Sequence, residues 1–496
     1  MPNMRLKPTD LPSPSSPRRP DGFAVLFLVA AGALLIWSEF TGAFTNDAYW
    51  QLVVGRWMVA HHAVLGHDIL SYASFGQRWV NVDWGWELAV YASWLAVGAW
   101  GLALVAGLVN VATMAVTAAT CRRLGVAWRS TSLIVFGAAV YLGPGLSARA
   151  QDASFLFFAV ELYVIFGRAQ SDRRWLAAIP FLMALWVNGD GAVILGLAVL
   201  VGVTAVAWLM CVPSFQQLAD PPLVSARWPL TIATGASLLA SLVSPWGVGA
   251  LITDVRLATV PSLTLHLPEW LPPAFNTQPF YLILALAPLV GLVIAATRRR
   301  LRVDISLALM SLALLAMSLR SVRLFPFFGL GFAVLVAQTT ASTGVEQAGT
   351  LSTRLRALQV FPAALLVALA ASSVLSPPSS IATYDQVVPQ RLFTLAGHQP
   401  GGLLTTQGIS AWVVWNDGLH PLMSTSDLPD AFGQLENDYV ALELGSANPA
   451  PILARWRVRT IVWLTPGPLA VWLTTQPCWH RLASQDHWGL WGDSCR

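Results

Sequence analysis

Runs of about twenty apolar residues recur along this sequence and constrain its fold more than any other feature. A helix needs about 20 apolar residues to cross a hydrocarbon core of roughly 30 Å. The runs therefore predict about eleven membrane-spanning helices. They lie near residues 22–40, 101–120, 130–147, 153–169, 175–188, 191–211, 228–245, 279–297, 303–319, 324–341 and 358–376.

The scarcity of charge supports a polytopic membrane protein. Charged residues make up 11% of the 496 residues, whereas a typical soluble domain has about 25%. This excludes a soluble globular enzyme and a disordered chain. A net charge of only +4 gives no basic surface for nucleic acid. We expect the lipid bilayer as a partner and no nucleic acid.

The distribution of basic residues predicts the orientation. More than half of the 29 basic residues fall in the N-terminal tail and in alternate loops, including the arginine cluster at 298–302. Basic residues mark the cytoplasmic side, so the N-terminus is expected in the cytoplasm. If the stretch 85–100 spanned the membrane, every later loop would change side, so we interpret it as an interfacial or half-inserted helix.

This orientation divides the chain into three parts of a multi-pass cell-membrane protein. Residues 1–21 are rich in Pro and Ser and are expected to form a disordered cytoplasmic tail. Residues 22–376 form the transmembrane domain, with a first outer loop at 41–100. Residues 377–496 lose the long apolar runs and are expected to form a small extracytoplasmic α/β or α+β domain.

Acidic residues gather at the outer ends of the predicted helices, and Glu161 alone falls within a span. A transporter places ionisable groups near the bilayer midplane. A gathering at one surface is more typical of an enzyme or receptor whose site opens outward. The acidic residues concerned are Glu39, Asp47, Asp68, Asp83, Glu87, Asp152, Asp190, Asp254 and Glu269.

Asp47 begins the densest polar segment of the first outer loop. Trp50, Val53, Val54 and Trp57 follow helical spacing, which places Asp47 near the start of a short amphipathic helix. Asp is a favoured helix N-cap. A carboxylate beside an apolar surface can also accept a proton or bind a divalent cation. Both interpretations can hold together.

An ordered set of short motifs resembles the GT-C superfamily of membrane glycosyltransferases, and most closely a group of bacterial GT-C-like membrane proteins. The resemblance covers about residues 22–376, and it departs from the group's pattern at Leu65, Asp83 and Asp190, where Pro, Glu and His are more usual. The motifs are Asp47-x-x-Trp50, Gly55-Arg56-Trp57, Asp68-x-x-Ser71-Tyr72, Trp79-Val80-Asn81-x-Asp83-Trp84, Arg149-x-Gln151, Trp186-x-Asn188-x-Asp190-Gly191, Ser244-Pro245-x-Gly247, Glu269-Trp270 and Arg320-x-x-Arg323.

The resemblance implies transfer of a sugar from a polyprenyl-phosphate donor to an acceptor at the outer face. Asp47 would be the general base or a ligand of a divalent cation, Mg²⁺ or Mn²⁺. Arginines suit the lipid phosphate because the guanidinium binds phosphate in a bidentate way. The expected substrate-binding residues are Arg149, Arg320, Arg323, Trp79, Asn81, Asp83, Asp152, Asn188, Asp190 and Glu269.

Several of these residues have a structural alternative. The arginines could instead anchor in lipid headgroups, and Trp79 could be interfacial packing rather than a sugar platform. Asp152 could cap the helix that follows it. The cluster of His61, His62 and His67 invites a zinc site, but adjacent histidines do not share a helix face and no cysteine is near.

Two of the four cysteines are predicted to form a disulfide. An antiparallel hairpin centred on Asp486 and His487 places Cys478 directly opposite Cys495. An oxidising location outside the membrane permits the bond. Cys121 and Cys211 fall at cytoplasmic helix ends and are expected to be free thiols.

The sequence thus favours a GT-C-type glycosyltransferase. The main alternative is a non-catalytic protein with the same fold that binds a lipid-linked saccharide or a protein partner. A transporter or flippase would depend on Glu161 instead of Asp47.

Overall fold

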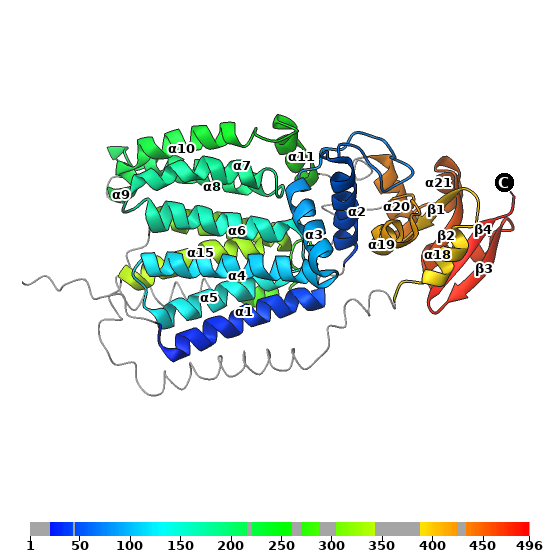
Figure 1. Ribbon diagram of the computed structural model, residues 1–496, viewed down its shortest axis with the longest axis horizontal. Coiled ribbons are helices and arrows are strands. Elements are labelled where there is room, and N and C mark those ends of the chain that lie inside the picture. The colour runs from blue at the N-terminus through cyan, green and yellow to red at the C-terminus, as the bar shows by residue number, and fades with distance from the viewer. Residues whose placement is uncertain are drawn as a thin grey trace, which may run out of the picture.

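A computed structural model describes residues 20–42, 45–213, 215, 221–259, 269–286, 304–342, 387–423 and 433–495. Its larger part is a bundle in which the long helices run side by side (Figure 1). The bundle helices are α1 (Gly22–Gly42), α4 (Trp100–Arg123), α5 (Trp128–Leu142), α6 (Ala150–Leu162), α7 (Ala178–Trp186), α8 (Val193–Leu209), α10 (Arg227–Ala240), α14 (Ile305–Arg320) and α15 (Phe325–Ser342).

Apolar composition and close packing explain these helices. Three of them are long and apolar enough to cross a membrane, at Trp100–Arg123, Ala150–Arg168 and Val322–Ala341. The second includes a π-helical turn at Tyr163–Arg168 that continues α6. Small residues let helices approach closely: a side chain at Gly107 of α4 would lie 3.0 Å from the Cα of Ile36 in α1.

The predicted runs fall on helices wherever the structure describes them. The run at 279–297 is described to residue 286 and is helical over 279–286, and the run at 358–376 lies outside the described residues. The number of membrane crossings therefore stays a prediction. Shorter elements connect the bundle helices: the 3₁₀ turns at Gly143–Gly145, Arg173–Ala177 and Val322–Leu324, and the helices α9 (Pro221–Ser225) and α11 (Val248–Thr259).

Two helices run across one end of the bundle: α2 (Asn46–His61) and α3 (Trp84–Val97) (Figure 1). They pack tightly because α2 has a glycine at the contact, where a side chain at Gly55 would lie 2.6 Å from the backbone oxygen of Glu87. The stretch interpreted from sequence as interfacial corresponds to α3, which lies beside α2 and not among the bundle helices.

The C-terminal unit contains a four-stranded sheet covered by short helices. Its strand order is β1-β2-β4-β3, with β1 parallel to β2 and the other pairs antiparallel. The strands are β1 (Gly402–Thr405), β2 (Val458–Leu464), β3 (Trp479–Gln485) and β4 (Trp488–Asp493). The helices are α18 (Gln390–Ala396), α19 (Gln407–Asp417), α20 (Gln434–Leu444), α21 (Pro449–Arg455) and α22 (Pro468–Thr474).

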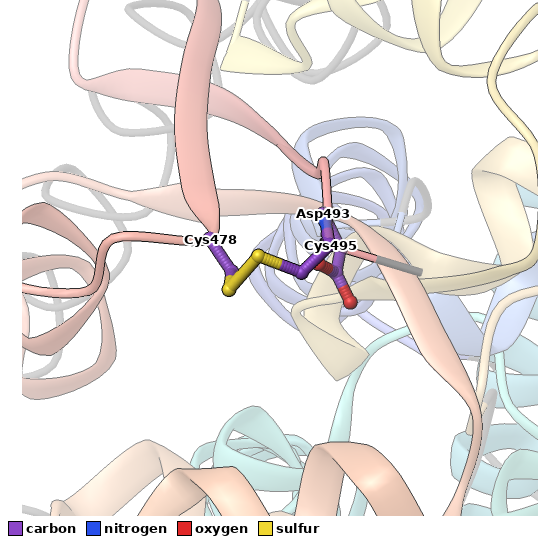
Figure 2. Close-up of side chains that lie close together, drawn as sticks. All are labelled: Cys478, Asp493 and Cys495. Carbon is purple, nitrogen blue, oxygen red and sulfur yellow. Dashed lines mark hydrogen bonds between the residues drawn. A yellow bond between two sulfur atoms is a disulfide. The ribbon is translucent and has the colours of Figure 1, made fainter.

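A disulfide closes the last hairpin. Cys478 is bonded to Cys495 across the open end of β3 and β4 (Figure 2), the pairing that the hairpin arithmetic predicts. The register of that arithmetic holds near the turn, where Gln485 faces Trp488, and shifts by one residue at an irregularity between Arg481 and Ala483. Cys121 and Cys211 are free.

The C-terminal unit sits on α2, on the side away from the bundle (Figure 1). The Asn46 side chain at the start of α2 accepts a hydrogen bond from the backbone N–H of Ala411 in α19, at 2.8 Å. The guanidinium of Arg56 stacks over Trp415, 4.3 Å from the ring centroid. The helix that carries Asp47 is therefore held between the bundle and the C-terminal unit.

Candidate active site

Four charged side chains that are far apart in sequence form one chain of ion pairs at the end of the bundle. An Asp47 carboxylate oxygen lies 2.9 Å from Nε of Arg149. Arg149 also pairs with Glu269, and the other carboxylate oxygen of Glu269 lies 2.6 Å from a terminal nitrogen of Arg323. All four side chains are partly exposed, between 27% and 31%. The structure thus brings together four residues named from the sequence.

A strained turn aims Arg149 at its two carboxylate partners. Arg149 immediately precedes α6, and Ala148 before it has φ of +52°, a conformation that residues other than glycine seldom adopt. The buried Glu39 carboxylate accepts the Ala148 N–H at 2.8 Å and the Asn110 side-chain amide at 3.1 Å. These bonds hold the turn, so Glu39 and Asn110 act on the site by positioning Arg149.

Glu269 joins the two arginines. Burial alone would raise the pKa of Glu269, but the guanidiniums of Arg323 and Arg149 outweigh it and lower that pKa below its ordinary value. The backbone oxygen of Glu269 also accepts the Arg323 N–H at 3.0 Å. Arg323 stacks over Trp270, 5.0 Å from the ring centroid, and its carbonyl accepts the Gln151 side-chain amide at 3.0 Å.

A cavity of about 450 Å³ opens beside this chain. Its polar wall includes Arg320, Arg323 and Trp270, and its apolar wall is built from α8, α11 and the ends of α14 and α15. Arg320 is exposed and ends α14, and among the described residues no carboxylate is paired with it. The apolar lining is Ile194, Leu195, Ala198, Leu257, Ala258, Met317 and Phe327.

Three aspartates also line the cavity: Asp83, Asp190 and Asp254. Asp190 accepts hydrogen bonds from the Ser154 hydroxyl and from the backbone N–H of Ala192 at 3.0 Å, so its carboxylate is held by the turn before α8. Asp254 lies against the backbone at Gly191, where a side chain would approach within 2.5 Å of its carboxylate. The cavity is therefore lined by three carboxylates as well as by its two arginines.

Four residues expected to bind substrate make contacts within the protein, and their binding roles stay predictions. Trp79 is buried and packs edge-on against Trp50, which leaves no free face for a sugar ring. Asn81 is buried and donates to Glu87 at 2.6 Å. The Asn188 side chain accepts from Trp84 at 2.9 Å.

Asp152 is the fourth. It is fully buried and does not line the cavity. It does not cap α6 either, because Arg149 occupies the N-cap position and the Asp152 carboxylate bonds none of the first N–H groups. The capping interpretation of Asp47 is corrected in the same way: Thr45 is the N-cap of α2, and Asp47 lies in the first turn, where a negative charge favours the helix dipole.

The described residues offer few ligands for a metal. One group of three acidic or sulfur ligands comes close together within them, Cys478, Asp493 and Cys495, and its two sulfurs are bonded to each other (Figure 2). Near Asp47 both oxygens of Glu269 face arginines. His61 stacks on Trp57 and does not join His67 in a zinc site.

Sequence reasoning missed the positioning role of Glu39 and Asn110. One signal was available, since Asn110 is a polar residue in the middle of an apolar run, and such residues in membrane helices usually have a bonded partner. The partner, Glu39, is 71 residues away in the chain, so the contact itself follows only from the packing of α1 against α4.

The fold is shared with solved structures of an oligosaccharyltransferase and of ArnT. No family model and no curated protein matches the chain. Among solved structures, it is similar to the oligosaccharyltransferase AglB from Archaeoglobus fulgidus in complex with an inhibitory peptide and a dolichol-phosphate. The TM-score is 0.55 at 12% identity over 95% of this chain and 74% of AglB.

Two further structures agree. The Archaeoglobus fulgidus oligosaccharyltransferase in complex with Zn and sulfate has a TM-score of 0.51 at 12% identity, over 89% of this chain and 68% of that one. ArnT from Cupriavidus metallidurans bound to undecaprenyl phosphate has a TM-score of 0.50 at 15% identity, over 95% and 98%. The chain therefore shares the fold of these solved structures at low sequence identity. The likeness does not reach the narrower bacterial group.

Proposed function

We propose that the protein is a GT-C glycosyltransferase that moves a sugar from a polyprenyl-phosphate donor to an acceptor at the outer face of the cell membrane. One observation carries this proposal. The apolar cavity with Arg320 and Arg323 on its polar wall lies directly beside the chain of ion pairs that ends at Asp47. Similar structures are described with dolichol-phosphate and undecaprenyl phosphate.

The two walls of the cavity suit the two parts of a lipid phosphate. The apolar wall would receive the isoprenoid chain, because burying apolar surface is favourable in proportion to its area. Arg320 and Arg323 would pair with the phosphate oxygens, since a guanidinium matches phosphate in a bidentate way. This arrangement would place the sugar toward Glu269, Arg149 and Asp47.

The transfer then follows from these groups. The acceptor hydroxyl oxygen bonds to the anomeric carbon of the sugar while the bond from that carbon to the phosphate oxygen breaks. The Asp47 carboxylate takes the hydroxyl proton, which requires an approach of about 3 Å. The arginines stabilise the negative charge that develops on the departing lipid phosphate. Arg149, paired with Asp47, fixes the direction of the carboxylate.

Asp47 as a ligand of Mg²⁺ or Mn²⁺ is the alternative form of the same proposal. The described carboxylates there are Asp47 and Glu269, and Glu269 is engaged by two arginines. The guanidinium of Arg149 already lies 2.9 Å from Asp47. This donor set does not fit a metal held by the protein, so no step above runs through one. Turnover in the presence of a chelator separates the two forms.

The decisive variant is Asp47→Asn in the full chain. The purified protein in liposomes is offered a panel of undecaprenyl-phosphate-linked hexoses and pentoses, and release of undecaprenyl phosphate is measured. We expect the wild-type protein to turn over at least one donor and the variant to lose roughly 10²- to 10⁴-fold in rate, the usual contribution of a general base. The free energy of unfolding should fall by about 1 kcal/mol or less, because the lost ion pair with Arg149 is partly exposed.

Asp486→Asn is the matched control, because Asp486 is exposed in the last hairpin turn with φ of +49°, a conformation that Asn also tolerates. Equal turnover by Asp47→Asn and wild type would remove the role given to Asp47. Donor binding without turnover in the wild-type protein would favour the non-catalytic alternative.

A further inference from the structure

A second cavity, separate from the candidate active site, lies between the loop that precedes α3 and the C-terminal unit. Its volume is about 760 Å³, and we call it the seam groove. Tyr72 and Ala73 form the wall on the loop side. Arg457, Arg459 and His420 are among the residues on the opposite wall. None of the residues that line the seam groove lines the candidate active site.

The seam groove has an excess of positive charge. Arg455 lines it too, but this arginine pairs with Asp438 at 2.6 Å. In the part of the chain that the structure describes, no carboxylate pairs with Arg457 or Arg459. Two arginines two residues apart thus line the same cavity, and neither has a paired carboxylate among the described residues.

The backbone at Arg457 has a conformation that is uncommon for residues other than glycine. Arg457 has φ of +54° just after α21, a position where helices commonly end on glycine. An arginine in this conformation costs free energy relative to glycine. Residues with such conformations cluster at active sites and ligand-binding sites. The conformation directs the chain from α21 into β2, so that Arg457 and Arg459 both reach the seam groove.

The loop wall is rigid. The buried Asp68 carboxylate accepts the Leu70 N–H at 2.6 Å and the hydroxyls of Ser71 and Ser74 at 2.8 and 2.5 Å. The Tyr72 hydroxyl then donates to the carbonyl of Trp456 across the seam at 2.9 Å. A preformed wall lowers the entropic cost of binding a ligand.

The remaining lining adds aromatic and glycine surface. Tyr72, Trp456 and His420 contribute rings, and four glycines lie in the lining, at 397, 401, 402 and 418. Two of these glycines leave room for lining side chains, since the Arg459 stem lies against Gly401 and the Tyr72 ring lies against Gly402. A cavity that combines arginines with aromatic rings is suited to a hydrated sugar more than to a lipid chain, because rings can pack against a sugar while polar groups bind its hydroxyls. The guanidiniums require an acidic group on that sugar.

We propose that the seam groove binds an anionic saccharide, with the carboxylate or phosphate of the sugar held by Arg457 and Arg459. The ligand is water-soluble and approaches from outside the membrane. Binding does not depend on the transfer reaction, so it would persist in the Asp47→Asn variant.

The test measures binding to the full-length protein in detergent by calorimetry. The probes are trigalacturonate, glucose 6-phosphate, neutral maltotriose and the acidic peptide triglutamate. We expect trigalacturonate or glucose 6-phosphate to bind, maltotriose to bind at least 10-fold more weakly, and higher salt to weaken the interaction. Which of the two anions binds more tightly identifies the acidic group.

Arg457→Gly is the sharpest variant, because glycine is favoured at this φ and the fold should be kept or stabilised. It should weaken the binding of the anionic sugar at least 10-fold. Arg391→Gln, which removes an equal charge from exposed α18 outside the seam groove, should have no effect. Unchanged affinity in Arg457→Gly would overturn the proposal, as would tighter binding of triglutamate or equal binding of maltotriose.

Discussion

The two cavities of this protein differ in how far their arginines are paired with carboxylates. Beside the bundle, Arg323 shares Glu269 with Arg149, and Arg149 also pairs with Asp47, whereas Arg320 has no paired carboxylate among the described residues. In the seam groove, Arg457 and Arg459 have no paired carboxylate among the described residues. The first cavity has a long apolar wall, and the second has rings and glycines.

This difference separates chemistry from recognition. Arginines fixed by carboxylates are oriented before a substrate arrives, which is what stabilisation of a transition state requires. Arginines without a partner have charge available for an incoming anion, which gives affinity and salt dependence. Under the two proposals, the apolar wall would select a lipid in the first cavity, and the unpaired arginines would select a water-soluble anion in the second.

Among the variants that compare the two cavities, the largest effect is expected from Glu269→Gln, which breaks the paired network. The two guanidiniums would face each other without a carboxylate between them, so we expect transfer to fall roughly 10²-fold. The free energy of unfolding should fall by about 1 to 2 kcal/mol, less than for a fully buried pair because these side chains are partly exposed. Turnover and chemical denaturation measure the two effects.

Asp486→Asn, an exposed change in the last hairpin turn, is the control for that variant. Trigalacturonate binding should be the same in Glu269→Gln and wild type. If it fell as much as transfer did, the two cavities would not be independent.

The pH dependence of the free energy of unfolding tests the same ion pairs of Glu269. The arginines lower the pKa of Glu269 in the folded protein, so its contribution is complete above the ordinary glutamate pKa of about 4.3. It is lost as the pH falls through the lowered folded value. Glu269→Gln should lack this part of the acid destabilisation, and an identical acid limb in both proteins would contradict the ion-pair geometry.

A smaller effect is expected from Arg320→Gln. Losing one charged contact to the phosphate should weaken undecaprenyl phosphate binding about 10-fold. Binding of undecaprenol, which has the same chain without the phosphate, should not change. The reciprocal variant Arg457→Gly should leave lipid phosphate binding unchanged. Weaker lipid phosphate binding in that variant would contradict the independence of the two cavities.

The smallest effect concerns the stability of the C-terminal unit. Burial, with the nearby Glu443 charge, raises the pKa of Glu436 to about 7. Glu436 is therefore protonated in the folded unit at acidic pH, and stability falls as the pH rises from about 4.3 through about 7. Glu436→Gln mimics the neutral form and should raise stability at pH 8 by about 1 kcal/mol, with no gain at pH 4, as measured by thermal unfolding.

The helices were predictable because apolar runs in a membrane protein have few other ways to satisfy their backbone. The sequence also indicated that Asp47, Arg149, Glu269 and Arg323 lie at helix ends on one side. Their pairing was not predictable, because the ion pairs join residues up to 120 positions apart through the packing of whole helices.

Other residues show where motif reasoning fails. Trp79, Asn81 and Asn188 look like binding residues by type, yet each is used to join α2, α3 and the turn after α7. The Asp68 carboxylate is likewise used within the protein, where it accepts hydrogen bonds from Leu70, Ser71 and Ser74 of its own loop. Polar residues near a site serve either the ligand or the scaffold, and the residue type alone does not distinguish the two uses.

An experimental map of the full chain with bound undecaprenyl phosphate tests the central claim most directly. The proposed site predicts phosphate density between the guanidiniums of Arg320 and Arg323, with the isoprenoid chain along Leu195, Leu257 and Phe327. Phosphate density elsewhere on the protein, with no undecaprenyl phosphate in this cavity, would contradict the account.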